Sequence, residues 1–240
     1  TDRHTVGILI NGNMTIAKVL NPSISYDPQK DLMPLSIICT APLVLAAAPE
    51  VVKTDARGFL GAARAAGSQW SCGTPGIGTI GHLGMELLKA RTGIGAGHVP
   101  YQGNPQVITG LASGQLQLAL LPPGLAEPQV KAGKLRAIGV TSARPSALVP
   151  DYPSLQEAGL KGFELEIWTA AAAPASLPPP IARRLNEVLA EIIRSPQVQQ
   201  KLFQHGYEAV GISGEALVHR VKADTAALAQ IIASQGIKLE

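Results

Sequence analysis

The sequence predicts an α/β protein that folds into two lobes. Up to Ala173, short apolar segments alternate with segments of helical periodicity, an order typical of sheets with mostly parallel strands and helices on their faces. The C-terminal third carries apolar stripes at helical spacing only. Two of the strand-like segments are long enough to run from one lobe into the other.

The expected strands are apolar runs bounded by glycine, proline or polar residues. They are Thr5–Asn11, Leu35–Ala48, Gln69–Cys72, Ala96–Pro100, Leu116–Leu121, Leu135–Thr141 and Glu164–Ala173. Helical spacing is found in Thr79–Arg91 and Asn104–Ser113. After the three prolines at 178–180 we expect three more helices. The first carries Leu185, Val188, Leu189 and Ile192, Ser195-Pro196 begins the second, and Ser213 caps the last, which carries Leu217, Val221, Leu228 and Ile232.

The two long segments, Leu35–Ala48 and Glu164–Ala173, exceed the usual strand length of about five or six residues. If both cross between lobes, residues 41–165 form one inserted lobe. Residues 1–40 and 166–240 then form the other, with a cleft between the two.

Composition excludes several classes of protein. Of the 240 residues 46% are hydrophobic, which is ample for a core, and the net charge is only +3. Lys and Arg are scattered rather than clustered with aromatic residues, so we expect no nucleic-acid partner. The longest apolar run, Leu35–Pro49, is too short and too interrupted to span a membrane. Cys39 and Cys72 are interpreted as core residues, although their spacing leaves open whether they pair.

A glycine-rich turn between an expected strand and an expected helix is the strongest candidate site. Glycines let the backbone approach a ligand closely, and the first amides of a helix face an anion. Two threonine hydroxyls flank the turn and suit a planar carboxylate. The predicted ligand-binding residues here are Thr74, Gly76, Gly78 and Thr79.

The same turn matches the dinucleotide pattern GxGxxG through Gly76, Gly78 and Gly81. That pattern needs an acidic residue after the next strand to bind a ribose, and Val99–Gly103 contains none. A small nucleotide-binding α/β enzyme therefore remains only as an alternative.

A second polar turn follows the first strand, and its side chains can hydrogen-bond a ligand directionally. It adds Asn11, Asn13 and Thr15 to the predicted ligand-binding residues. No catalytic residue and no metal site is predicted, since the five histidines show no paired-ligand spacing. His82, one turn into the helix, is interpreted as a packing residue or as a neighbour of the ligand contacts.

Several motifs in order resemble the extracytoplasmic solute receptors of tripartite tricarboxylate transporters, the Bug family. The resemblance rests on Tyr26-Asp27-Pro28-Gln29-Lys30-Asp31, Gly76-Ile77-Gly78-Thr79-Ile80-Gly81-His82-Leu83, His98-Val99-Pro100-Tyr101-Gln102-Gly103, Lys131-Ala132-Gly133-Lys134-Leu135-Arg136 and Val140-Thr141-Ser142-Ala143-Arg144.

The resemblance implies a type II periplasmic-binding (Venus flytrap) fold that closes on a small organic carboxylate. It further implies a monomeric periplasmic protein, exported by a removed signal peptide, that serves membrane transporter subunits and needs no cofactor. In that family two strand-to-helix loops grip the carboxylate, and one of them corresponds to Thr74–Thr79. A sensory module of the same fold is a further alternative.

Two departures from the family pattern affect what we expect. The family's N-terminal strand, glycine-rich anion loop, helix and strand have no counterpart here, so an incomplete first lobe is expected. After the strand at Leu116–Leu121, relatives often carry an acidic residue, whereas this sequence has Leu121-Pro122-Pro123-Gly124. That favours a simple carboxylic acid over an amino acid.

Overall fold

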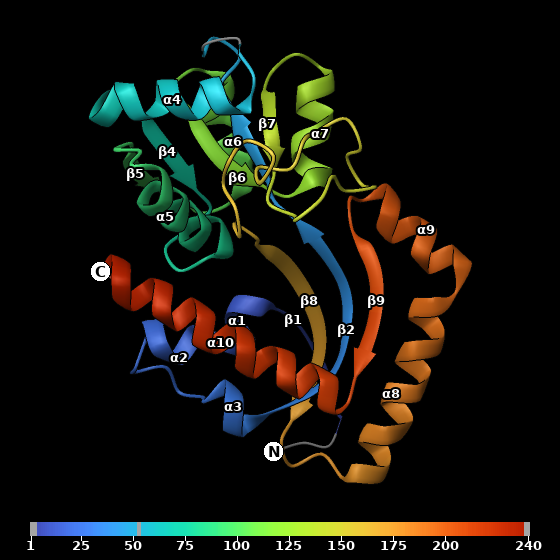
Figure 1. Ribbon diagram of the computed structural model, residues 1–240. Coiled ribbons are helices and arrows are strands. Elements are labelled where there is room, and N and C mark those ends of the chain that lie inside the picture. Colours follow the sequence, from blue (N-terminus) through green and yellow to red (C-terminus); the bar gives the residue numbers. More distant parts are fainter. Residues whose placement is uncertain (1–3, 52–53, 238–240) are drawn as a thin grey trace. The chain divides into compact units, whose positions relative to one another are not determined.

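The computed structural model describes residues 4–51 and 54–237. The chain divides into two compact units, one joining Thr1–Ala41 to Ile167–Glu240 and the other comprising Pro42–Glu166 (Figure 1). Each boundary lies one residue from the boundary expected from the two long segments. We call these unit 1 and unit 2 and describe each by itself.

Unit 1 contains a four-stranded sheet in the order β1-β8-β2-β9. Its strands are β1 (Gly7–Ile10), β2 (Leu32–Pro42), β8 (Glu166–Pro174) and β9 (Glu208–Ser213), and its helices are α1 (Asn11–Thr15), α2 (Ala17–Leu20), α3 (Pro28–Asp31), α8 (Pro179–Arg194), α9 (Pro196–Gln204) and α10 (Glu215–Gln235). β1 runs antiparallel to β8, and β2 runs antiparallel to β9. The expectation of a mostly parallel sheet is wrong for this unit, because both of these pairings are antiparallel.

Helices cover both faces of β8. Its alanines alternate between the faces, as a strand requires, and their small size lets a helix approach on each side. One face packs with α10 through Leu217 and Val221, and the other packs with α8 through Ala182. The Trp168 indole, buried among the first group, donates from Nε1 to Asp224 Oδ2 on α10 at 2.7 Å.

Unit 2 contains a five-stranded sheet in the order β5-β4-β6-β3-β7. Its strands are β3 (Val44–Ala47), β4 (Ser71–Thr74), β5 (Gly97–Pro100), β6 (Leu118–Leu121) and β7 (Arg136–Val140), and its helices are α4 (Ala56–Ala66), the short 3-10 helix η1 (Gly67–Gln69), α5 (Ile80–Thr92), α6 (Asn104–Ala112) and α7 (Pro123–Lys131). β4 pairs parallel with β5 and β6, as successive strand–helix–strand connections predict. β3 pairs antiparallel with β6 and β7, so two of the four pairings of this sheet are antiparallel and the sheet is mixed rather than mostly parallel as expected.

The expected single strand Leu35–Ala48 is two strands that meet at Leu43. Thr141, fully buried, explains the break: its hydroxyl accepts from Leu43 N at 2.8 Å and donates to Leu165 O at 2.7 Å. The Thr141 amide in turn donates to Leu43 O at 2.9 Å. Within unit 2, one side chain therefore fixes the two places where the long segments enter.

Three local expectations need correction. The polar turn at Asn11 is a short helix, α1, because Thr15 Oγ1 bonds Asn11 O and closes a helical turn. Gly214, not Ser213, occupies the N-cap position of α10, since Ser213 still belongs to β9. Ser195 does sit at the N-cap of α9, but its hydroxyl donates back to Ile192 O instead of capping.

Candidate functional site

The glycine loop, which we define as Thr74–Thr79, joins the end of β4 to the start of α5. β4 lies between two parallel neighbours, so the loop leaves the sheet at the carboxyl edge of three strands. Ligands of open α/β sheets bind at this edge. Thr79 caps the helix, since its side chain accepts from His82 N, and Gly93 ends it in the left-handed conformation.

The loop's shape depends on its glycines. Gly76 has φ 131° and Gly78 has φ 77°, conformations that residues with a Cβ rarely adopt. A Cβ on Gly81 would lie 3.1 Å from Pro75 Cδ and 3.4 Å from Leu120 O. The glycines of the GxGxxG pattern therefore serve a tight turn and close packing, whatever the ligand.

Hydrogen bonds within the loop and the start of α5 leave two adjacent amides of the helix without an acceptor in the part of the chain that the structure describes. Gly78 N donates to His82 Nδ1 at 3.0 Å, and Thr79 Oγ1 donates to Gly76 O at 2.8 Å. Within residues 4–51 and 54–237, no acceptor pairs with the backbone N–H of Ile80 or Gly81. These two amides lie at the positive end of the α5 dipole, where an anion is stabilised.

The structure assigns the predicted residues different roles. Thr74 is buried, and its hydroxyl shares a hydrogen bond with His98 Nε2 at 2.7 Å, which ties the start of the loop to β5. Gly76, Gly78 and Thr79 set the backbone conformation. Ile80 and Gly81 lie one and two residues beyond the predicted set, and the amides of Gly76 and Ile77, inside the loop, also have no acceptor among the described residues.

His82, interpreted from the sequence as a packing residue or a neighbour of the ligand contacts, and His98, which was given no role there, both contact the glycine loop. The His82 and His98 rings stack with centroids 4.2 Å apart and planes 10° from parallel. Burial, and then the neighbouring His98, lower the pKa of His82 to about 4, and burial lowers the pKa of His98. The signal was present in the sequence, because Gly78 and His82 are four residues apart at a helix start.

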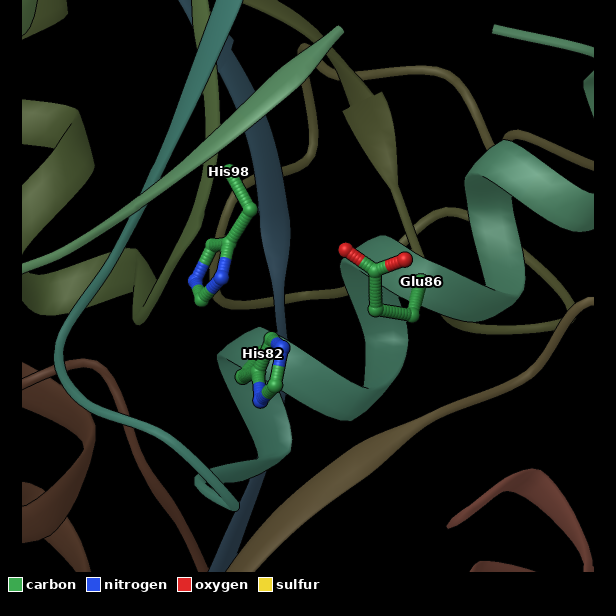
Figure 2. A group of neighbouring side chains, drawn as sticks. All are labelled: His82, Glu86 and His98. Carbon is green, nitrogen blue, oxygen red and sulfur yellow. The ribbon is translucent and has the colours of Figure 1, made fainter. Parts of the chain in front are cut away.

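Figure 2 shows these rings beside Glu86, one turn further along α5. The ligand atoms of His82, Glu86 and His98 lie within 4.8 Å of one another, a spacing compatible with a metal ion. The stacking opposes that use: a metal lies in the plane of each imidazole that binds it, and an ion in one ring's plane would fall well outside the other's. His82 Nδ1 is also occupied by Gly78 N, and Glu86 pairs with Lys89 at 2.9 Å.

The second predicted group lies in and around α1. Asn11 and Thr15 are buried, and the Thr15 hydroxyl donates to Asn11 O at 2.7 Å. Asn13 is exposed, while its carbonyl accepts from Tyr26 Oη at 3.2 Å. Only Asn13 of this group presents its side chain at the surface.

The cysteines are core residues, as expected. Cys39 and Cys72 are both buried and free. Burial raises the pKa of Cys72 to about 11, which disfavours the reactive thiolate at neutral pH.

Comparisons with known proteins agree with the fold and identify relatives. A family model described as "Tripartite tricarboxylate transporter family receptor" matches residues 1–237. A UPF0065 protein from the tcbD–tcbE intergenic region of Pseudomonas sp. strain P51 is 31% identical over 227 residues, covering 94% of this chain and 67% of that protein. The chain spans about two thirds of the length of the curated relatives it matches.

Two solved structures match nearly all of this chain. A protein of R. palustris, solved with adipate, is 28% identical with a TM-score of 0.89, covering 99% of this chain and 79% of that one. The periplasmic binding protein BugD is 24% identical with a TM-score of 0.88, covering 100% of this chain and 80% of that one.

No helix in the described part of the chain is both long and apolar enough to cross a membrane.

Proposed function

The chain belongs to the family of tripartite tricarboxylate transporter receptors, and from that premise we propose that it captures a small organic carboxylate at the glycine loop. It then delivers this solute to the membrane subunits of a tripartite transporter. The family is one of extracytoplasmic receptors and not of enzymes, so binding and release are its task. We propose that the mature protein acts in the periplasm as a monomer, after removal of a signal peptide.

The pair of free amides at the start of α5 carries the proposal. Ile80 N and Gly81 N are adjacent donors, and a carboxylate offers two acceptor oxygens. Hydrogen bonds from amides to a charged acceptor contribute about 1.5–3 kcal/mol each. A dipole aligned with the same amides adds to this attraction.

Simple dicarboxylates are the ligands we favour. The adipate-bound relative from R. palustris supports a chain with two carboxylates and no amine. The segment Leu121-Pro122-Pro123-Gly124, where β6 ends and α7 begins, carries no acid that could pair with an amine.

From unit 1 we retain Asn13 as a proposed ligand contact, since its side chain is exposed. Asn11 and Thr15 are proposed to hold α1 in shape, because both are buried. Asn13→Ala tests this division: a loss of affinity supports the contact, and an unchanged affinity removes it.

Calorimetric titration with adipate, glutarate, succinate, glutamate and aspartate tests the proposed function. We expect saturable binding of at least one dicarboxylate, tighter than that of the amino acid of the same chain length. Tighter binding of glutamate or aspartate would contradict the ligand class. Binding of NAD or ATP with no response to any carboxylate would instead favour the nucleotide-binding alternative. Copurification with a signalling protein rather than transporter subunits would favour the sensory one.

A further inference from the structure

The stacked imidazoles join the two ends of the glycine loop. His98, on β5, lies 2.7 Å from the Thr74 hydroxyl at the loop's start. His82, on α5, accepts from Gly78 N near the loop's end at 3.0 Å. Since the two rings stack at 4.2 Å, a continuous set of contacts runs from Thr74 to Gly78. The loop is therefore held from both ends by side chains that lie outside it.

The hydrogen bond to Gly78 determines the proton position on His82. An amide N–H can donate to Nδ1 only if that nitrogen carries no proton, so the neutral ring bears its proton on Nε2. Protonation would place two N–H groups against each other and break the bond. The same event would set a cation against the stacked His98.

Burial and the charges around the rings together determine when the imidazoles take up a proton. Glu86, on α5, favours the charged imidazole, while Lys89 and His98 oppose it. Burial is the largest effect and keeps both rings neutral at pH 7. Glu86 is itself paired with Lys89, in a half-buried ion pair.

We propose that His82 and His98 are positioning residues for ligand capture: as a neutral stacked pair they occupy Gly78 N and the Thr74 hydroxyl and leave Ile80 N and Gly81 N for the carboxylate. This rests on the proposed function. The imidazoles do not bind the anion as cations; they hold the loop that does. Protonation of the pair therefore weakens binding, whereas protonation of an anion-contacting histidine would strengthen it.

Two substitutions at His82 test whether the loop depends on the hydrogen-bond acceptor for Gly78 N or on the ring as a whole. His82→Asn keeps an oxygen at the position of Nδ1, within reach of Gly78 N. His82→Gln moves its polar group one bond further, to the position of Nε2. Neither side chain titrates. Adipate affinity at pH 7.5 is expected to fall about tenfold in His82→Gln, as loss of one loop-setting bond implies, and by less than about threefold in His82→Asn.

A pH series then tests the positioning role. Between pH 7.5 and 4.0, adipate affinity of the wild type should fall about twofold more than that of His82→Asn, because at a pKa of about 4 half of the unliganded protein carries the proton and ligand protonation affects both proteins equally. Nitrogen NMR of the wild-type protein provides a readout without any variant. It should show the Nε2–H tautomer of His82, and adipate should lower the pKa of that ring further, because binding and protonation oppose each other.

The outcomes are distinct. Equal adipate affinity in the wild type and His82→Gln, or a pKa that rises when adipate binds, would overturn the positioning role and leave the proposed function intact. If the wild-type protein binds no dicarboxylate, the proposed function fails, and this inference fails with it.

Discussion

Thr141→Val should destabilise unit 2 more than its small change in shape suggests. Valine matches threonine in size but lacks the hydroxyl that accepts from Leu43 N and donates to Leu165 O. Leu43 is 2% exposed and Leu165 is 8% exposed, so water cannot replace either bond readily. Each unsatisfied buried group costs about 1–3 kcal/mol, and we expect a total loss of about 3 kcal/mol in the free energy of unfolding.

Urea unfolding followed by circular dichroism measures this loss. Thr92→Val is the matched control, because Thr92 is also buried and its hydroxyl donates only to Leu88 O, a carbonyl within α5. That variant should lose less than about 1 kcal/mol, since no backbone amide there depends on the hydroxyl. If Thr141→Val lost less than about 0.5 kcal/mol, or no more than Thr92→Val, the role given to Thr141 would be refuted.

Three further predictions concern stability. Asp224→Ala leaves the buried Trp168 Nε1 without its acceptor and should cost about 1–3 kcal/mol in urea unfolding; a neutral result would contradict the role of that bond in docking α10. Gly139→Ala would place a Cβ 2.8 Å from Pro153 O and should lower the free energy of unfolding by about 1–3 kcal/mol. Gly61→Ala adds a methyl group in open space on α4 and should raise the free energy of unfolding by about 0.5–1 kcal/mol. Equal effects of the two substitutions would be inconsistent with the packing. The pKa of His82 is about 4 in the folded protein and 6.5 in the unfolded chain. As the pH falls below 6.5, the unfolded chain therefore takes up a proton at His82 before the folded protein does. Wild-type stability should therefore fall by up to about 3 kcal/mol towards pH 4, and urea unfolding of His82→Asn should show a smaller fall.

Much of unit 2 was predictable because its signals are local. The apolar run of β6 and the capped, periodic helix α5 are read directly from the sequence, and their alternation predicts parallel pairing. The antiparallel pairings of unit 1 were not predictable in this way, because β1 and β8 are distant in the chain and only their direction in space decides the pairing. The break at Leu43 was missed for the same reason: it depends on Thr141, far along the chain.

The sequence indicates the glycine turn as the candidate site but not the contacts around it. The glycine turn and the helix cap at Thr79 are sequence signals with a clear physical cause. That Thr74 is buried against His98 follows from the parallel register of β4 and β5, which composition and spacing do not contain. Asn11 and Thr15 look like an exposed polar turn, yet they lie in the short helix α1, where both are buried and the Thr15 hydroxyl donates to Asn11 O.

Removing one amide from the start of α5 tests the central claim most directly. Ile80→Pro deletes the Ile80 N–H at the first helical position, which proline tolerates, and the extended backbone of Thr79 (φ −70°, ψ 158°) suits a following proline. Ile80→Val keeps the amide and controls for the change in the buried side chain.

Calorimetric titration of adipate into both variants should show an affinity about tenfold or more lower for Ile80→Pro than for Ile80→Val, since a bond to a charged acceptor is lost. Equal affinities in the two variants would contradict binding of the carboxylate by the first amides of α5.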